Sequence, residues 1–375
     1  MTIYLDNNAT TPMETDVREL VSHYMNQEFG NAGSRTHEYG LIAKKAVETA
    51  RRQIAGVVEA SPDEVIFTSG ATESNNLAIL GLAEHLKEIG KDHIVTSSIE
   101  HKAVLEPIEH LEKQGFAVTY VQPSRNGSVA VEDMLDALRE DTGLVSIMAV
   151  NNETGVIQPV SEIAEALSDT DLFLHVDAAQ GFGKLLTPLV EPRIDLISVS
   201  GHKIYGPKGV GALIARRRDY KSPPIQPLMF GGGQEKGLRP GTLPVPLIAG
   251  LGLAAEIAVK KNKEWWIQCQ TVKKQAIEAF DELGSLVHGR DEAMPNVINI
   301  SIPGVDSEAA MVALKGIAAI SNGSACTSSS YTPSHVLTAM GLSEDEIAGA
   351  LRISWNHMKG KIPWSQISDA LRILM

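Results

Sequence analysis

Short apolar runs rich in β-branched residues alternate with amphipathic stretches between about residue 60 and residue 215. Between the runs, apolar residues recur at helical spacing, and Val131, Met134, Leu135 and Leu138 form one such helix face. Strands that alternate with helices are typical of an α/β fold whose mostly parallel sheet is covered by helices on both faces. The runs predict strands at 65–68, 93–97, 118–121, 144–150, 172–176, 196–199 and 211–215.

The pattern changes in the second half of the chain. Closely spaced prolines and glycines between residues 221 and 246 argue against a regular element and predict a long functional loop. Beyond the loop, Val272, Ala276 and Phe280 share a helix face, and a strand is expected near 297–302. We therefore predict a large domain at 15–258 and a smaller α+β domain formed by 1–14 and 259–375.

The composition argues against several classes of protein. With 33 Lys and Arg against 46 Asp and Glu, the 375 residues carry a formal charge of −13 and no long basic block, so direct nucleic-acid binding is not expected. The longest apolar stretch, 247–259, is too short for a membrane span. The N-terminus lacks the features of a signal peptide, which predicts a cytoplasmic protein. Cys269 and Cys326 cannot form a disulfide framework, in agreement with a reducing compartment.

Polar clusters follow most of the predicted strands. In an open parallel sheet, the carboxyl ends of the strands lie side by side and form the ligand crevice, so these clusters predict one composite site. The clusters are 69–75, 100–102, 151–153, 177–180 and 200–203.

The contents of these clusters indicate a phosphorylated aldehyde cofactor. The segment 69–72 follows a strand and opens a helix, where backbone N–H groups bind phosphate. Asp177 follows a buried strand, where a half-buried carboxylate needs a cationic partner or hydrogen bonds. Lys203 precedes a Gly-Pro turn, and a desolvated lysine there can form a Schiff base. With the imidazoles of His101 and His202, these groups match the requirements of pyridoxal 5′-phosphate. Singly, each has an ordinary interpretation as a cap, turn, structural or solvated residue; together they favour the cofactor.

Sequence motifs for other kinds of ligand site are either absent or lie in the wrong structural context. The segment 250–255 matches G-x-G-x-x-A, but prolines rather than a strand precede it, so it indicates close helix packing. The chain contains no Walker loop, no H-E-x-x-H and no paired C-x-x-C, so no metal site built by the protein is expected.

Cys326 lies in a stretch, 321–330, that has almost no apolar residue. Such a stretch predicts an exposed loop in which nothing can bury the sulfur, whereas Cys269 is predicted to be an ordinary helix residue. No Lys, Arg or His adjoins Cys326 to lower the pKa of its thiol, so activation has to come from the site that it visits.

At this point the chain resembles a known family. The segments 4–12, 200–209 and 323–326 resemble the pyridoxal-phosphate-dependent cysteine desulfurases of the nitrogen-fixation and iron–sulfur-cluster type, within the class V aminotransferase superfamily. The resemblance implies a fold type I transferase in which a mixed, mostly parallel sheet is flanked by helices. It also implies conversion of L-cysteine to L-alanine, with a persulfide formed on Cys326 for transfer to a sulfur-acceptor protein.

The resemblance further implies individual roles. Lys203 would carry the Schiff base, Asp177 would pair with the pyridinium nitrogen, and His101 would stack on the ring and share proton transfer with Lys203. Thr242 would reach the phosphate from the other subunit of a homodimer, although Pro240 stands where family members commonly have Ser. The remaining implied contacts are to the phosphate (Ala71, Thr72, Ser200, His202), to the ring oxygen (Gln180, Asn152) and to the substrate (Asn152, Arg352).

Several alternatives stay open at this stage. One alternative is another class V activity, such as an aminotransferase or a selenocysteine-specific lyase, and an aminotransferase would not need Cys326. A non-catalytic sulfur carrier on a degenerate enzyme fold would not bind the cofactor. The acceptor could be a cluster scaffold, a tRNA-thiolation enzyme or a DNA-phosphorothioation system, and Cys326 could also be a transient iron–sulfur ligand.

Overall fold

A seven-stranded mixed sheet forms the centre of the computed structural model, which describes residues 2–290, 292–322, 332–358 and 360–375. Only β8 runs antiparallel to its neighbours β2 and β7; the other pairs in this sheet are parallel. The strand order is β2 (Val65–Thr68), β8 (Gly211–Ala215), β7 (Leu196–Ser200), β6 (Phe173–Asp177), β5 (Thr142–Met148), β3 (His93–Ser97) and β4 (Ala117–Val121).

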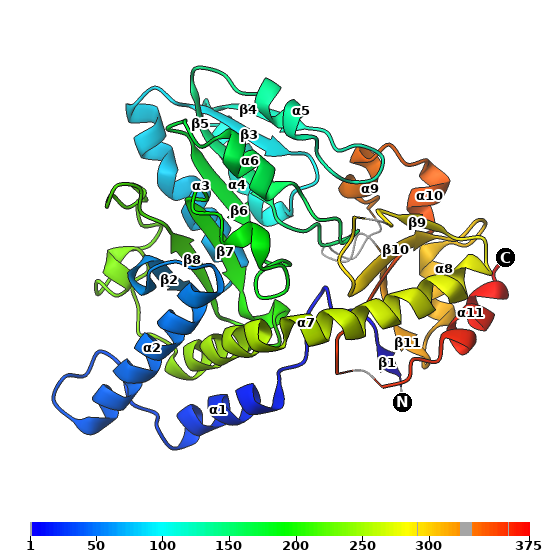
Figure 1. Cartoon of the computed structure of the whole chain (residues 1–375), viewed down its shortest axis with the longest axis horizontal. Coiled ribbons are helices and arrows are strands. Elements are labelled where there is room, and N and C mark those ends of the chain that lie inside the picture. The colour runs from blue at the N-terminus through cyan, green and yellow to red at the C-terminus, as the bar shows by residue number, and fades with distance from the viewer. Residues whose placement is uncertain (1, 291, 323–331, 359) are drawn as a thin grey trace.

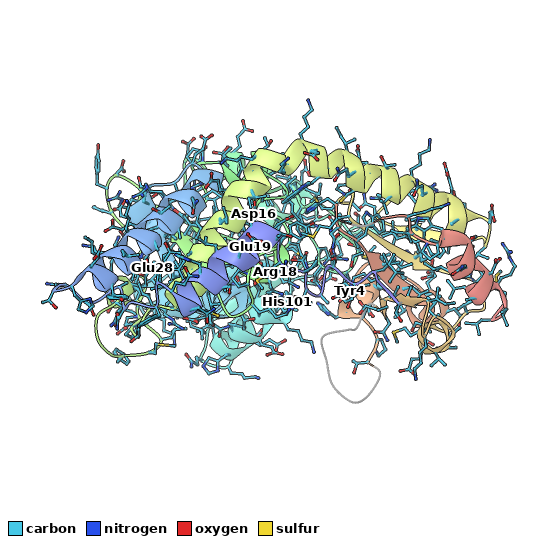
Figure 2. All side chains as sticks on the ribbon, turned by 90° about the horizontal axis from the view of Figure 1, so that it is seen from below. Tyr4, Asp16, Arg18, Glu19, Glu28 and His101 are labelled. Carbon is cyan, nitrogen blue, oxygen red and sulfur yellow. The ribbon has the colours of Figure 1, made fainter. Side chains whose placement is uncertain are left out.

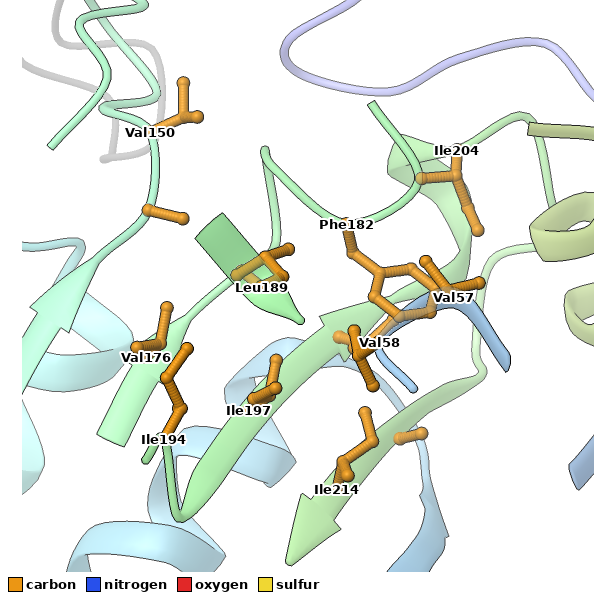
Figure 3. Close-up of a cluster of buried hydrophobic side chains, with 14 of the residues drawn as sticks. Val57, Val58, Val150, Val176, Phe182, Leu189, Ile194, Ile197, Ile204 and Ile214 are labelled. Carbon is orange, nitrogen blue, oxygen red and sulfur yellow. The ribbon is translucent and has the colours of Figure 1, made fainter. Parts of the chain in front are cut away.

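Helices cover both faces of this sheet because its strands are apolar on both sides. In β8, Leu213 belongs to the core beneath α3 (Ala71–Glu88) and α4 (Lys102–Glu112). Ala212 and Ile214 belong to the opposite core, part of which Figure 3 shows. That second core is covered by α1 (Thr15–Asn26), α2 (Glu38–Val57), α5 (Val131–Asp136), α6 (Val160–Ala166) and the first half of α7 (Val245–Asp281).

A second, antiparallel sheet has its own core, which includes Phe280, Trp355 and Trp364. The two-residue strand β1 (Ile3–Tyr4) pairs in parallel with β11 (Ala318–Ala319), so the N-terminal segment packs on this part of the molecule. The strand order is β12 (Ser321–Asn322), β13 (Ala350–Ser354), β10 (Val297–Ser301) and β9 (Leu286–His288), and the helices nearby are α8 (Ser307–Ala313), α9 (His335–Ala339), α10 (Glu344–Ala348) and α11 (Trp364–Arg372).

Helix α7 connects the two parts and runs across the molecule in Figure 1. Its glycines permit close packing: a Cβ added at Gly252 would lie 2.5 Å from the Cα of Ala50 in α2, and one added at Gly250 would lie 2.6 Å from Cγ2 of Val21 in α1. The predicted interpretation of the 250–255 motif as close helix packing is confirmed. Short 3₁₀ turns complete the described secondary structure at Pro62–Glu64, Thr187–Leu189, Gly201–Lys203 and Glu235–Gly237.

The α/β class, the mixed sheet and all seven predicted strands are present, with shifts at some ends. The strand predicted at 144–150 occupies 142–148, and Asp177, predicted to follow a strand, is the last residue of β6 because it pairs with Met148 and Ser198 on both sides. The predicted domain boundary at 258/259 lies inside α7 and stays a prediction. In the described ranges, no helix has the length and apolar character to cross a membrane.

The close approach of α2 and α7 makes a testable prediction. Gly252→Ala should lower the free energy of unfolding by about 1–3 kcal/mol through overpacking, although alanine is the better helix former. Gly56→Ala in α2 is the matched control, because nothing lies within 4 Å of an added Cβ there; it should gain about 0.5–1 kcal/mol. Urea denaturation of both variants measures the difference, and shifts of the same sign would contradict the packing argument.

Candidate active site

A cavity of about 620 Å³ opens at the carboxyl ends of the central strands. Its wall includes residues of the segments that follow β2, β3 and β5, and residues of the short turn after β7. The last residues of β6 and β7 also line it. Asn8 and Ala9 enter from the N-terminal segment, and Arg352 enters from β13 of the second sheet. The two sheets and the N-terminal segment therefore meet at one cavity.

Asp177 is held rigidly in the cavity wall. Its backbone pairs with β5 and β7, and the residue is only 5% exposed. Its Oδ2 accepts a hydrogen bond from Asn75 Nδ2 at 2.8 Å, and its Oδ1 accepts one from the Ala179 N–H at 2.9 Å. These two partners are neutral, so the carboxylate remains able to compensate a positive charge on a ligand.

Lys203 is fixed by the N-terminal segment. It ends the short turn after β7, and its Nζ donates to the carbonyl oxygens of Asn8 at 2.5 Å and Ala9 at 2.8 Å. Gln180 Nε2 donates to the same Asn8 carbonyl at 2.9 Å. The amine is therefore positioned on the cavity wall, where it can bind an aldehyde carbon covalently.

His101 caps α4 and lines the cavity. Its Nδ1 accepts a hydrogen bond from the Ala103 N–H at 3.1 Å, which assigns the ring proton of the neutral imidazole to Nε2. Burial and, more weakly, the charge of Lys203 lower the pKa of His101, while Asp177 opposes this shift. The imidazole is thus kept neutral at pH 7, with an Nε2 proton that it can donate and a ring that can stack on a ligand.

A phosphate cradle forms at the start of α3. Gly70, with φ of +154°, has a backbone conformation that favours glycine, and a Cβ added to Gly211 would lie 2.6 Å from the Cα of Gly70. The first residues of this 18-residue helix, whose N–H groups have no acceptor within the helix, line the cavity together with Ser200 and His202. Burial and nearby lysines lower the pKa of His202 to about 4. His202 is therefore a neutral side chain at pH 7.

Arg352 brings a buried guanidinium to the cavity. The residue is 1% exposed; its Nη1 donates to the Asn152 carbonyl at 3.1 Å and its Nη2 to Oδ1 of Asp6 at 2.8 Å. The buried Nε–H has no acceptor among the described residues. A guanidinium with spare donors suits a ligand carboxylate.

Glu100 is a buried carboxyl group directly before His101. It is 0% exposed, and its Oε1 accepts hydrogen bonds from Ser97 Oγ at 2.5 Å and from the Met148 N–H at 3.0 Å. Burial raises the pKa of Glu100 to about 8, with a smaller contribution from Asp177. At neutral pH this side chain is mostly a neutral acid.

The structure brings most of the predicted site residues together. Thr242 is exposed and does not line the cavity of its own chain, and Cys326 lies outside the described residues. The predicted residues that do line the cavity are Ala71, Thr72, His101, Asn152, Asp177, Gln180, Ser200, His202, Lys203 and Arg352.

Sequence reasoning missed four contributors: Asp6, Asn8, Asn75 and Glu100. Asn75 and Glu100 fall within the polar clusters that follow strands, which was the available signal. Asp6 and Asn8 belong to a polar run far from these clusters in sequence, and it is their contacts with Arg352, Lys203 and Gln180 that reveal their part in the site.

Residues 3–359, nearly the whole chain, match the family described as Aminotransferase class-V. The arrangement of the cavity agrees with this match. The chain belongs to this family.

The most informative relatives within this family include cysteine desulfurases. Over 360 residues the chain is 46% identical to the cysteine desulfurase IscS of Escherichia coli O139:H28, an alignment covering 94% of this chain and 87% of that protein. The structure of DndA from Streptomyces lividans is 52% identical, with a TM-score of 0.83 and coverage of 93% and 98%. The structure titled SspA in complex with cysteine is 39% identical, with a TM-score of 0.83 and coverage of 96% and 100%. The prediction of a pyridoxal-phosphate-dependent cysteine desulfurase is confirmed.

The cavity fits the cofactor of this family. The anchored amine of Lys203 can hold the aldehyde carbon, and the start of α3 can hold the phosphate. The carboxylate of Asp177, whose hydrogen-bond donors are neutral, can pair with a protonated ring nitrogen. All three groups line the same cavity.

The buried acid at position 100 predicts a pH-dependent stability. The folded protein keeps the Glu100 proton up to about pH 8, whereas the unfolded chain releases it near pH 4.3. The folded state binds the extra proton between these values, so this group destabilises it progressively as the pH rises. Glu100→Gln removes this effect, and its gain in unfolding free energy should be about 3–4 kcal/mol larger at pH 8 than at pH 5.

Urea denaturation at the two pH values measures that gain. The exposed Glu19→Gln in α1, labelled in Figure 2, is the control for loss of a carboxylate elsewhere. A gain from Glu100→Gln that does not change with pH would contradict the assignment of Glu100 as a neutral acid.

Proposed function

We propose that this cysteine desulfurase removes sulfur from L-cysteine and forms a persulfide on Cys326, leaving L-alanine. The observation that carries the proposal is the joint placement of Lys203, Asp177 and Arg352 on one cavity. An amine, a carboxylate and a guanidinium at these positions suit a cofactor-bound amino acid. The similarity to SspA, whose structure was solved in complex with cysteine, supports L-cysteine as the substrate.

When bound, pyridoxal phosphate supplies an electron sink for the bonds around the substrate Cα. Lys203 would hold the aldehyde carbon and, once the substrate amine has replaced it there, would accept or return the Cα proton at Nζ. His101 would share proton transfer from a neutral ring. Asp177 would keep the ring nitrogen protonated, and Gln180 and Asn152 would contact the ring oxygen. The phosphate would be held by Ala71, Thr72, Ser200 and His202. Arg352 binds the substrate carboxylate, with Asn152 beside it, and so orients the sulfur.

The strand that precedes Cys326 in the chain, β12, lies beside Arg352. In β12, Ser321 pairs with Arg352 and Asn322 pairs with Leu351. Cys326 follows Asn322 by four residues, a length that spans at most about 14 Å. This tether supports a role for Cys326 at the substrate that Arg352 binds.

The sulfur transfer balances without an added oxidant. The Cys326 thiolate attacks the substrate sulfur, and a new S–S bond forms while the Cβ–S bond breaks. The electron pair of the broken bond passes to the substrate carbon, which takes up a proton to give alanine. The outer sulfur of the persulfide then passes to a protein acceptor, a step for which Cys326 has to be reachable from outside. The cytoplasmic location predicted from the sequence stays a prediction.

Cys326→Ser should bind cofactor and cysteine normally but form no persulfide. Intact-mass analysis after incubation with cysteine should show one extra sulfur atom on the wild-type protein and none on this variant. Cys269→Ala is the matched control, because Cys269 is a buried residue of α7 and its thiol pKa is raised to about 12 by burial. A sulfur gained by the Cys326→Ser variant, or lost from the control, would contradict the assignment.

We also propose a homodimer in which Thr242 completes the phosphate site of the partner subunit. In its own chain, Thr242 is exposed and away from the cavity lining. Its loop nevertheless reaches the rim, because Arg239 Nε donates to Oε1 of Glu73 at 2.9 Å and Glu73 lines the cavity. A loop tied to the rim with an outward-facing threonine supports a contribution across a two-fold axis.

A dimer of two defective subunits tests this arrangement. Lys203→Ala and Thr242→Glu subunits should each have little activity alone, because one lacks the amine and the other places a carboxylate near the phosphate. The heterodimer, purified through two different tags, should recover about half of the wild-type activity, since one of its two sites is intact. No recovery would show that Thr242 does not act across subunits.

A further inference from the structure

The guanidinium of Arg352 already has a carboxylate partner. Its Nη2 donates to Oδ1 of Asp6 at 2.8 Å, and the two side chains are 2% and 19% exposed, respectively. The two charges compensate each other in a largely buried pair. A substrate carboxylate that binds Arg352 therefore contacts a guanidinium whose charge is already balanced, and the carboxylate of Asp6 lies on the same guanidinium.

The Asp6 carboxylate reaches the cavity through Arg352, because Arg352 lines the cavity and Asp6 does not. The backbone of Asp6 bridges to Ser354, two residues beyond Arg352 in β13, and its carbonyl accepts a hydrogen bond from the Tyr4 hydroxyl at 2.9 Å. The carboxylate thus extends from a fixed backbone and holds the guanidinium in one orientation.

Glu153 is a buried carboxyl group that also interacts electrostatically with Arg352, but its hydrogen bond is made to another residue. Its Oε2 accepts a hydrogen bond from Ser334 Oγ at 2.5 Å, and burial raises its pKa to about 7. Among the described residues, Asp6 is the carboxylate that hydrogen bonds to Arg352.

We propose that Asp6 is a positioning residue that orients Arg352 and sets the affinity of the site for amino-acid carboxylates. Its negative charge opposes the substrate and product carboxylates, which weakens their binding and favours release of alanine. Asp6→Asn removes the negative charge but keeps the side-chain oxygen that accepts from Arg352. The buried guanidinium then lacks a counter-ion, and a ligand carboxylate can take that place. This inference rests on the proposed function, in which Arg352 binds the substrate carboxylate.

The test measures binding of L-alanine to the cofactor-loaded protein through the visible absorption of the cofactor. In Asp6→Asn, the dissociation constant for alanine should fall about tenfold. Alanine should also raise the melting temperature of this variant more than that of the wild type. Cysteamine, which has an amine and a thiol but no carboxylate, should bind both proteins equally. Asp16→Asn, an exposed change in α1 (Figure 2), should behave as the wild type.

The outcomes separate this inference from the function on which it rests. An unchanged or higher dissociation constant for alanine in Asp6→Asn would overturn the role of Asp6 alone. Asp6→Ser, a second neutral variant, should shift the constant in the same direction and replaces Asp6→Asn if that protein does not fold. If Arg352→Gln binds alanine as tightly as the wild type, Arg352 is not the carboxylate site, and both its proposed role and the role of Asp6 are wrong, whereas the Cys326→Ser experiment still tests the sulfur transfer.

Discussion

The hydrogen bonds from Lys203 Nζ to two backbone carbonyls of the N-terminal segment are the constraint on which the site depends. The same segment holds Arg352 through Asp6, and it begins in a strand paired with β11. A few consecutive residues therefore fix the distance between the amine on the central sheet and the guanidinium on the second sheet. The hydrogen bond from Arg352 Nη1 to the Asn152 carbonyl adds a second link between the two sheets.

The charges of the cavity are controlled by burial. His101 and His202 have lowered pKa values and are neutral, and Glu100 keeps its proton because burial raises its pKa. Asp177 stays available because its described hydrogen-bond donors are neutral. Charged groups on the wall of such a cavity interact more strongly than in bulk water, which favours a ligand that carries a phosphate, a ring cation and a carboxylate.

The sequence predicted the central sheet and most of the cavity lining, because strand ends in a parallel sheet bring polar clusters together. It placed Asp177 after β6, whereas pairing on both sides makes it the last residue of that strand. The roles of Asp6 and Asn8 could not be predicted by this reasoning, since their contacts join residues that are hundreds of positions apart in the chain. Local periodicity carries no information about such contacts. The resemblance, rather than any pattern, pointed to Arg352 and Thr242.

The most direct test of the account is the identity of the lysine that binds the cofactor. Two other lysines are the alternatives to exclude: Lys208, which lines the cavity, and Lys184, which does not line it but has a pKa lowered to about 7 by burial. Borohydride reduction of the cofactor-loaded protein, followed by peptide mass mapping, fixes the cofactor to the lysine that holds it. The account predicts the label on Lys203. A label on Lys184 or Lys208 would contradict it.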